Sequence, residues 1–314
     1  AAWPAWINSC TTLIHQKPWK KACSAANLLE VASSQEIQNY LKTHFTLYKS
    51  WRDDAADTGL ITGYYQPILK GSRTPSKKYS TPIYKTPVDL ITVDLSELYP
   101  EMKFKRLRGK VEGNKLLPYF SREEISSNEN LLKGNELFWV DNAVEAFFLE
   151  IQGSGIIELE DGSKIPIGYA DQNGHPYRSM GRALINAGEL TKDTASMQSI
   201  KAWANKNKKK LKAFLDKNPS FVFFRELESG LAGPIGAQGV PIIAERSIAI
   251  DRKYIPMGAP VLLATTFPNS TNTLNRLVIA QDTGGAIRGP IRADYYWGSG
   301  PEAGAKAGAM KQQG

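Results

Sequence analysis

The chain has 314 residues, 42% of them hydrophobic, which is enough to bury a substantial core and predicts one large or two modest domains. The formal net charge is +8 and the sequence pI is about 9.2, so the composition is compatible with an anionic partner. The positive charge is spread along the chain and no segment resembles a nucleic-acid-binding module, which argues against nucleic acid as that partner.

The first sixty residues predict helices and one short covalent loop. Residues 26–45 place apolar side chains at helical spacing, namely Leu28, Leu29, Ile37, Tyr40 and Leu41. Cys10 and Cys23 lack the C-x-x-C spacing of a zinc site, and the three histidines are scattered, so a disulfide between the two cysteines is favoured. A disulfide favours an oxidising compartment, periplasmic or secreted, with two buried thiols in a cytosolic protein as the alternative. No membrane span is predicted, because prolines interrupt the longest uncharged stretch, residues 254–275.

The middle of the chain mixes strands and helices. Residues 59–69 predict a strand that a loop follows, and residues 156–165 predict a hairpin with Asp161-Gly162 at its turn. Residues 179–188 predict a short helix that ends at a glycine, and residues 196–219 predict a longer one with an apolar stripe. The basic run at residues 207–212 is interpreted as the solvated face of that longer helix.

From Phe221 onward, short β-rich runs separated by glycine and proline predict a small barrel or sandwich. The apolar run Leu277-Val278-Ile279 leads to Asp282 in a glycine-rich turn, and Asp294 follows beside Tyr295, Tyr296 and Trp297. Aromatic packing and nearby negative charge both raise the pKa of a carboxyl group, as a catalytic acid requires.

Three other interpretations of these aspartates were weighed. The triplet D-T-G occurs at Asp57 and at Asp282, as in a bilobal aspartic protease, but the first triplet follows a polar, acidic segment. A metal site formed by Asp251, Asp282 and Asp294 matches no compact ligand loop. The third alternative is a structural Asp294 that caps a turn, with the aromatic residues in the core.

Several segments together resemble the membrane-bound lytic transglycosylase A family. They are SIAIDRKYIPMG, AQDTGGAIRG and RADYYWGSGPEAG in the C-terminal part, and upstream ITGYYQP, EIQGSG, YADQNGHPYRSMGRALI, SMQSIKAW and NPSFVFF. They cover residues 60–308 in the order of the family. The resemblance implies a mainly β fold with N-terminal helices, in which a double-psi β-barrel domain carries an inserted second β-rich domain with a groove between them. The implied boundaries are residues 1–65 and 226–314 for the barrel and residues 66–225 for the inserted substrate-binding domain.

The resemblance also implies a peptidoglycan lytic transglycosylase that cleaves the β-1,4 bond between MurNAc and GlcNAc and leaves 1,6-anhydro-MurNAc ends. The catalytic aspartate of the family falls on Asp294, with Asp251 and Asp282 as its companions. One carboxyl group suffices, because the 6-hydroxyl of the muramic acid attacks its own anomeric carbon, whereas an inverting or retaining hydrolase needs a second carboxylate. The resemblance implies no cofactor and no metal.

Binding roles are expected for the other segments. The candidates that stack on sugars, bond to glycan hydroxyls or line the groove are Tyr64, Tyr65, Gln152, Gly153, Ser154, Tyr169, His175, Tyr177, Arg178, Gly284, Gly285 and Trp297. His175 also suits a structural loop histidine, and the glycines suit turns.

The resemblance extends to partners and location. Family members begin at a lipidated cysteine, so an outer-membrane anchor at the periplasmic face of a Gram-negative cell is expected outside this sequence. Peptidoglycan glycan strands are the expected partner, together with a cell-wall enzyme complex, for a monomeric protein. A non-catalytic peptidoglycan-binding protein and an inverting glycoside hydrolase are the alternative functions.

Overall fold

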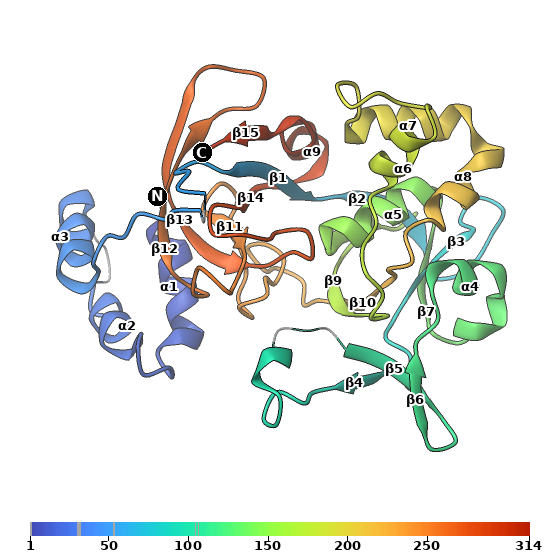
Figure 1. The fold of residues 1–314 in the computed structure, drawn as a ribbon, viewed down its shortest axis with the longest axis horizontal. Helices are drawn as coiled ribbons and strands as arrows, with labels where there is room; N and C mark the ends of the chain where they lie inside the picture. The colour runs from blue at the N-terminus through green and yellow to red at the C-terminus, as the bar shows by residue number, and fades with distance from the viewer. Residues whose placement is uncertain (1, 30–32, 53, 104, 106) are drawn as a thin grey trace. The chain divides into compact units, whose positions relative to one another are not determined.

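The computed structural model describes residues 2–29, 33–52, 54–103, 105 and 107–314, which form two compact units (Figure 1). Unit 1 comprises Ala1–Gln66 and Gly230–Gly314, and unit 2 comprises Pro67–Ser229. The chain thus leaves unit 1, forms the whole of unit 2, and returns. The described residues are mainly β with helices at the N-terminus, which confirms the predicted fold class, while the groove between the units stays a prediction.

Unit 1 is built on one six-stranded sheet in the order β12-β13-β11-β14-β1-β15. Its strands are β1 (Leu60–Gln66), β11 (Ser247–Ile250), β12 (Pro260–Thr266), β13 (Thr273–Asp282), β14 (Ala293–Ser299) and β15 (Lys311–Gln313). The two edge strands meet, because Thr265 Oγ1 of β12 donates to the carbonyl of Gln313 in β15 (2.6 Å). Gln312 Nε2 of β15 likewise donates to Thr266 Oγ1 at 2.6 Å. The sheet therefore curls into a barrel; its double-psi connectivity stays a prediction.

Two strand pairs of this barrel are parallel, β1 with β14 and β11 with β13, and they join distant parts of the chain. Helix α9 (Gly300–Ala309) follows β14 directly and packs against β1 and β14 (Figure 1). Gly304 of α9 permits this approach, because a Cβ atom there would lie 2.8 Å from the ring of Tyr65.

The N-terminal helices form a separate cluster on unit 1. They are α1 (Trp3–Leu13), α2 (Lys20–Ala26) and α3 (Ser34–His44). A disulfide joins Cys10 of α1 to Cys23 of α2. The cluster is anchored by the fully buried Gln281 of β13, whose Nε2 donates to the carbonyl of Ala5 and to Ser9 Oγ, both at 2.9 Å.

The predicted helix over residues 26–45 is wrong in its first part. α2 ends at Ala26 and Leu28 is exposed, whereas α3 begins at Ser34. The start of α3 is fixed by a capping box, in which Ser33 and Glu36 satisfy each other's backbone amides. Part of the predicted segment, residues 30–32, lies outside the described residues.

Unit 2 contains a six-stranded sheet in the order β10-β9-β8-β2-β7-β3 and a three-stranded sheet β4-β5-β6. The strands of the first are β2 (Ile68–Ser72), β3 (Thr81–Tyr84), β7 (Glu136–Val140), β8 (Ser154–Glu158), β9 (Lys164–Gln172) and β10 (Val222–Glu226). Those of the second are β4 (Ile91–Val93), β5 (Leu107–Glu112) and β6 (Lys115–Pro118). The predicted hairpin is confirmed, since β8 and β9 pair antiparallel around Gly162, which has a positive φ of 82°.

Five helices of unit 2 accompany these sheets. They are α4 (Arg122–Ser127), α5 (Ala143–Gln152), α6 (Met180–Asn186), α7 (Met197–Lys206) and α8 (Lys208–Leu215), with short 3₁₀ turns at Pro100–Met102 and Glu129–Leu132. α5 packs against β8, and the helices α5 to α8 share a core that includes Phe147, Trp203 and Phe214. The single long helix predicted over residues 196–219 is wrong, because it divides at Asn207 into α7 and α8. The lysines of the basic run are exposed, as predicted.

Candidate active site around Asp294

The barrel brings the candidate acid to one face of its sheet. Thr62 of β1 pairs with Asp294 of β14, and Ala249 of β11 pairs with both Asp294 and Asp282. Paired residues on neighbouring strands direct their side chains to the same side of a sheet. Asp294 and Asp282 therefore lie on one face, on the two strands that flank β11.

The environment of Asp294 raises its pKa. The side chain is half-buried, and desolvation is the largest effect, raising the pKa from 3.8 to about 6. Opposing this, the Thr62 hydroxyl donates to Asp294 Oδ1 at 2.6 Å, and the positive charge of Arg292 lowers the pKa further. The negative charge of Asp282 raises it.

Arg292 acts on Asp294 through Thr62 as well as through space. Arg292 Nη2 donates to Thr62 Oγ1 at 2.9 Å, and the same hydroxyl donates onward to the carboxyl group. This chain of two hydrogen bonds orients the donor that fixes one oxygen of Asp294.

The other oxygen of Asp294 remains open. Oδ2 accepts no hydrogen bond from the described residues. No buried side-chain polar atom in the described part of the chain lacks a partner, so Oδ2 must be in contact with solvent. A carboxyl group held at one oxygen and open at the other can exchange a proton with a ligand.

The companion aspartates are held differently. Asp282 accepts from the Tyr64 hydroxyl at 3.0 Å, from the amide of Ala237 at 2.9 Å and from its neighbour Thr283 at 2.8 Å. Asp251 is buried and accepts from the amides of Lys253 (3.1 Å) and Gly289 (3.0 Å). Each of these carboxyl groups is therefore held by at least two donors. These two residues suit positioning and electrostatic roles.

Two of the other interpretations can now be compared with the geometry. Asp57 of the first D-T-G triplet is exposed and pairs with Lys49 at 2.8 Å, which lowers its pKa. The paired buried carboxyls of an aspartic protease are therefore absent from this site. Within the described residues, no three His, Cys, Asp or Glu side chains are grouped closely enough to hold a metal ion.

The aromatic residues around Asp294 divide between the two faces of β14. Tyr296 shares the face of Asp294 and lies against Tyr64, with ring centroids 5.2 Å apart. Trp297 points to the opposite face, where its ring contacts Tyr295 and Phe267 and its Nε1 donates to Met310 Sδ. With 5% of its surface exposed, Trp297 packs among these side chains, and its contact with sugar stays a prediction.

Tyr64 and Tyr65 are also buried, in positions on β1 that face opposite sides. The Tyr64 hydroxyl donates to Asp282, and burial together with the charge of Asp282 raises the pKa of Tyr64 well above 10. Gly284 and Gly285 lie two and three residues after Asp282, in the loop that follows β13. In this loop Gly289 adopts the positive φ, 113°, and its amide holds Asp251.

The remaining predicted site residues belong to unit 2. Gln152 and Gly153 end α5, Ser154 begins β8, and the amide of Tyr169 in β9 donates to the carbonyl of Gly153 at 2.7 Å. Tyr177 and Arg178 lie exposed in the segment before α6. His175 is bonded through Nε2 to the carbonyl of Tyr119 at 2.7 Å, which fits the structural role weighed for it.

Sequence analysis missed Thr62 and Arg292. Arg292 lies two residues before Asp294, so the two-residue period of a strand would have placed it on the same face. Thr62 gave no comparable signal, because its contact depends on the register between strands that are 232 residues apart.

Comparison with known proteins shows which family the chain belongs to. The model of the MltA specific insert domain matches residues 60–225, and the model of the 3D domain matches residues 246–314. The chain belongs to the MltA family. A relative, the membrane-bound lytic murein transglycosylase A of Escherichia coli (strain K12), is 35% identical over 269 residues, which are 82% of this chain and 66% of that protein. The chain thus spans just under two thirds of the length of this relative.

Solved structures of the MltA family give the same result. MltA from Neisseria gonorrhoeae in a monoclinic form is 37% identical, with a TM-score of 0.83 over 99% of this chain and 85% of that one. Escherichia coli MltA with bound chitohexaose is 26% identical, with a TM-score of 0.73 over 99% of this chain and 88% of that one. No helix in the described part of the chain is long and apolar enough to cross a membrane.

Proposed function

We propose that this chain is a peptidoglycan lytic transglycosylase in which Asp294 is the single catalytic acid and base. The observation that carries the proposal is the state of Asp294, a half-buried carboxyl with a pKa of about 6, fixed at one oxygen by Thr62 and open at the other. Family membership and the names of the curated relatives point to the same activity.

In the proposed reaction, protonated Asp294 donates its proton to the glycosidic oxygen between MurNAc and GlcNAc as that bond breaks. The resulting carboxylate takes the proton of the MurNAc 6-hydroxyl while the 6-oxygen bonds to the anomeric carbon. The products are a 1,6-anhydro-MurNAc end and a free GlcNAc hydroxyl, and Asp294 is protonated again. Attack within one sugar replaces the attack of an external water.

The bonding of Asp282 and Asp251 supports a one-carboxyl mechanism. A retaining hydrolase needs a second carboxylate as nucleophile, and an inverting one needs it as a base for water. The hydrogen bonds to Asp282 from Tyr64, Ala237 and Thr283 instead hold it as a charged neighbour that keeps the Asp294 proton in place.

Substrate contacts and location are parts of the same proposal. Unit 2 acts as the substrate-binding domain, with glycan contacts from Gln152, Gly153, Ser154, Tyr169, Tyr177 and Arg178. The protein works as a monomer in the periplasm, on an outer-membrane lipid anchor. The relatives named membrane-bound support a membrane location, and the disulfide suits an oxidising compartment.

The test is digestion of murein sacculi followed by mass analysis of the products. We expect anhydro-sugar ends, each lighter by one water than a reducing end, and a loss of roughly 10²- to 10⁴-fold in rate for Asp294→Asn. Asp57→Asn, an exposed aspartate of the other D-T-G triplet, is the matched control and keeps full activity.

Two outcomes would refute the proposal. Reducing ends alone would identify a hydrolase, and product formation unchanged by Asp294→Asn would remove Asp294 from the reaction. Binding of sacculi without any product would leave a non-catalytic peptidoglycan-binding protein.

A further inference from the structure

Unit 2 contains a positively charged pocket that lies outside the site around Asp294. Its volume is about 710 Å³, within the range of small-molecule sites. It is lined by Tyr177, Arg178, Ser179, Arg182, Ala183, Asn186, Ala187 and Lys217. We call it the basic pocket.

The charge of the basic pocket is not balanced by its own lining. Arg178, Arg182 and Lys217 supply three positive charges, and no lining residue is acidic. Across the described chain, no carboxylate lies within ion-pair distance of any of these three side chains. Grouped cations repel one another, so an anionic ligand would lower the free energy of this arrangement.

Nearby acidic side chains have other partners. Asp216, next to Lys217 in the sequence, pairs with Lys212 at 2.7 Å and accepts from Ser126. Glu189, which follows α6, pairs with Lys210 at 2.8 Å and accepts from Trp203. These acids are therefore not available to neutralise the pocket.

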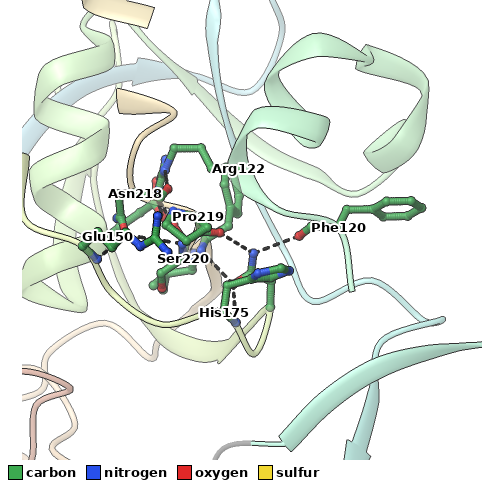
Figure 2. Close-up of polar contacts among 11 residues, drawn as sticks. Phe120, Arg122, Glu150, His175, Asn218, Pro219 and Ser220 are labelled. Carbon is green, nitrogen blue, oxygen red and sulfur yellow. Dashed lines mark hydrogen bonds and ion pairs between the residues drawn. The ribbon is translucent and has the colours of Figure 1, made fainter. Parts of the chain in front are cut away.

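A buried hydrogen-bond network holds the two segments that form the basic pocket. The amide of Arg178 donates to Asn218 Oδ1 at 2.9 Å, which joins the segment before α6 to the residue after Lys217. Beneath them, Arg122 Nε donates to the carbonyl of Asn218 at 3.0 Å and Nη2 donates to that of Ser220 at 2.5 Å (Figure 2).

The network balances its own charge and is closely hydrogen-bonded. Arg122 forms a bidentate ion pair with Glu150, in which Nη1 donates to Oε1 at 2.8 Å and Nη2 donates to Oε2 at 2.7 Å. Asn173 Nδ2 donates to the carbonyls of Phe120 and Pro219, both at 2.8 Å (Figure 2). His175 Nε2 is bonded to the carbonyl of Tyr119. The cations of the basic pocket are thus displayed on a preformed scaffold, which reduces the entropy lost when a ligand binds.

The lining is compatible with a peptide carboxylate. Arginine guanidinium groups suit carboxylates because they bond to both oxygens at once. Ala183, Ala187 and the ring of Tyr177 add apolar surface, and the amide of Asn186 can bond to a peptide group. Cations beside small apolar side chains suit a short acidic peptide with small side chains.

We propose that the basic pocket binds carboxylates of the peptidoglycan stem peptide. The inference rests on the proposed function, because that substrate is a glycan that carries short acidic peptides. Tyr177 and Arg178 belong to the segment proposed to contact glycan, so one segment serves both parts of the substrate. The pocket then makes the enzyme prefer glycan strands that retain their peptides.

The test compares two substrates, intact glycan strands and strands from which an amidase has removed the peptides. The variant is Arg182→Gln with Lys217→Gln, two exposed residues outside the proposed glycan contacts. We expect its KM for peptide-bearing strands to rise roughly tenfold while kcat is unchanged, as for loss of charge-assisted hydrogen bonds. Its kinetics on stripped strands stay those of the wild type.

The control variant removes the same charge elsewhere in unit 2. Lys115→Gln with Lys133→Gln changes two exposed lysines that form no ion pair among the described residues. We expect this control to behave as the wild type on both substrates. Equal losses of the pocket variant on both substrates, or no loss on either, would overturn the proposal.

A binding experiment separates this proposal from the proposed function. Calorimetry with the free stem tetrapeptide is expected to give an affinity that falls at higher salt, after amidation of the peptide carboxylates, and in the pocket variant. If the wild type cleaves no glycan but binds the tetrapeptide in this way, the proposed function fails and the pocket assignment stands. If inorganic phosphate binds and the tetrapeptide does not, the pocket is a phosphate site and the assignment fails.

Discussion

Two carboxyl groups, Glu150 in unit 2 and Asp294 in unit 1, differ in how many of their oxygens accept hydrogen bonds. The side chain of Glu150 is 9% exposed, and its two oxygens accept from both ends of the Arg122 guanidinium and from the amide of Val222. Asp294 accepts from one hydroxyl, that of Thr62, and the positive charge of Arg292 acts on it both through space and through that hydroxyl.

The difference separates structural from chemical use of a buried acid. A carboxylate whose two oxygens are both bonded holds the chain in place, as Glu150 does where α5 meets β10. A carboxyl group with one donor and one open oxygen keeps a raised pKa and an exchangeable proton, as Asp294 does. Completeness of hydrogen bonding, more than burial, tells the two apart.

The largest expected effect is the loss of stability on breaking the ion pair between Arg122 and Glu150. Arg122→Met leaves Glu150 buried without its cation, so we expect unfolding in urea to show a loss of about 3–5 kcal/mol at pH 7. Replacing both partners, as in Arg122→Met with Glu150→Leu, restores most of the stability. A single variant as stable as the wild type would refute the structural role.

The second prediction concerns the cost of ionising Asp294. Its pKa in the folded protein, about 6, lies above the ordinary 3.8, so the folded state binds this proton more tightly than the unfolded chain does. That stabilisation is complete below about pH 4 and is lost as the pH rises through 6. It amounts to at most about 3 kcal/mol for a rise of this size.

Asp294→Asn removes the ionisable group while keeping an oxygen for Thr62. We expect urea unfolding to show the variant equal to the wild type near pH 4 and more stable at pH 8, by about 1–3 kcal/mol. Asp57→Asn provides the comparison at an exposed site and shows no such gain. An Asp294→Asn protein that is less stable than the wild type at pH 8 would contradict the raised pKa.

The third prediction is the pH dependence of catalysis. The acid must be protonated at the start of each cycle, so kcat/KM is expected to fall about tenfold for each pH unit well above a pKa of about 6. The measurement is the initial rate of anhydro-product release at limiting substrate. A rate that stays level between pH 6 and pH 8 would argue against Asp294 as the acid.

The smallest expected effect comes from removing the hydrogen bond that the Thr62 hydroxyl donates to Asp294. The Thr62 hydrogen bond lowers the pKa of Asp294, so Thr62→Val is expected to move the alkaline limb of the kcat/KM profile upward by roughly half to one pH unit. Thr62→Ser keeps a hydroxyl at the same position and should leave the limb unchanged. A downward shift in Thr62→Val would show that the hydrogen bond stabilises the protonated form instead.

Much of the local structure could be predicted from patterns of neighbouring residues. The β8–β9 hairpin follows from Asp161-Gly162 between alternating segments, and the β-rich end follows from its short apolar runs. Local patterns failed where a single residue sets the start or the end of a helix. Asn207 divides one predicted helix into α7 and α8, and the capping box at Ser33 starts α3 later than the apolar spacing suggested.

The sequence by itself determined the residue types of the site, because the segments around Asp251, Asp282 and Asp294 carry the family resemblance. Only the tertiary structure decided how each of them works. Strand register brought Thr62 to Asp294, and strand alternation buried Trp297 on the far face of β14. A pKa depends on which groups surround a carboxyl in space, and one of those groups, Thr62, comes from a strand 232 residues away in the chain.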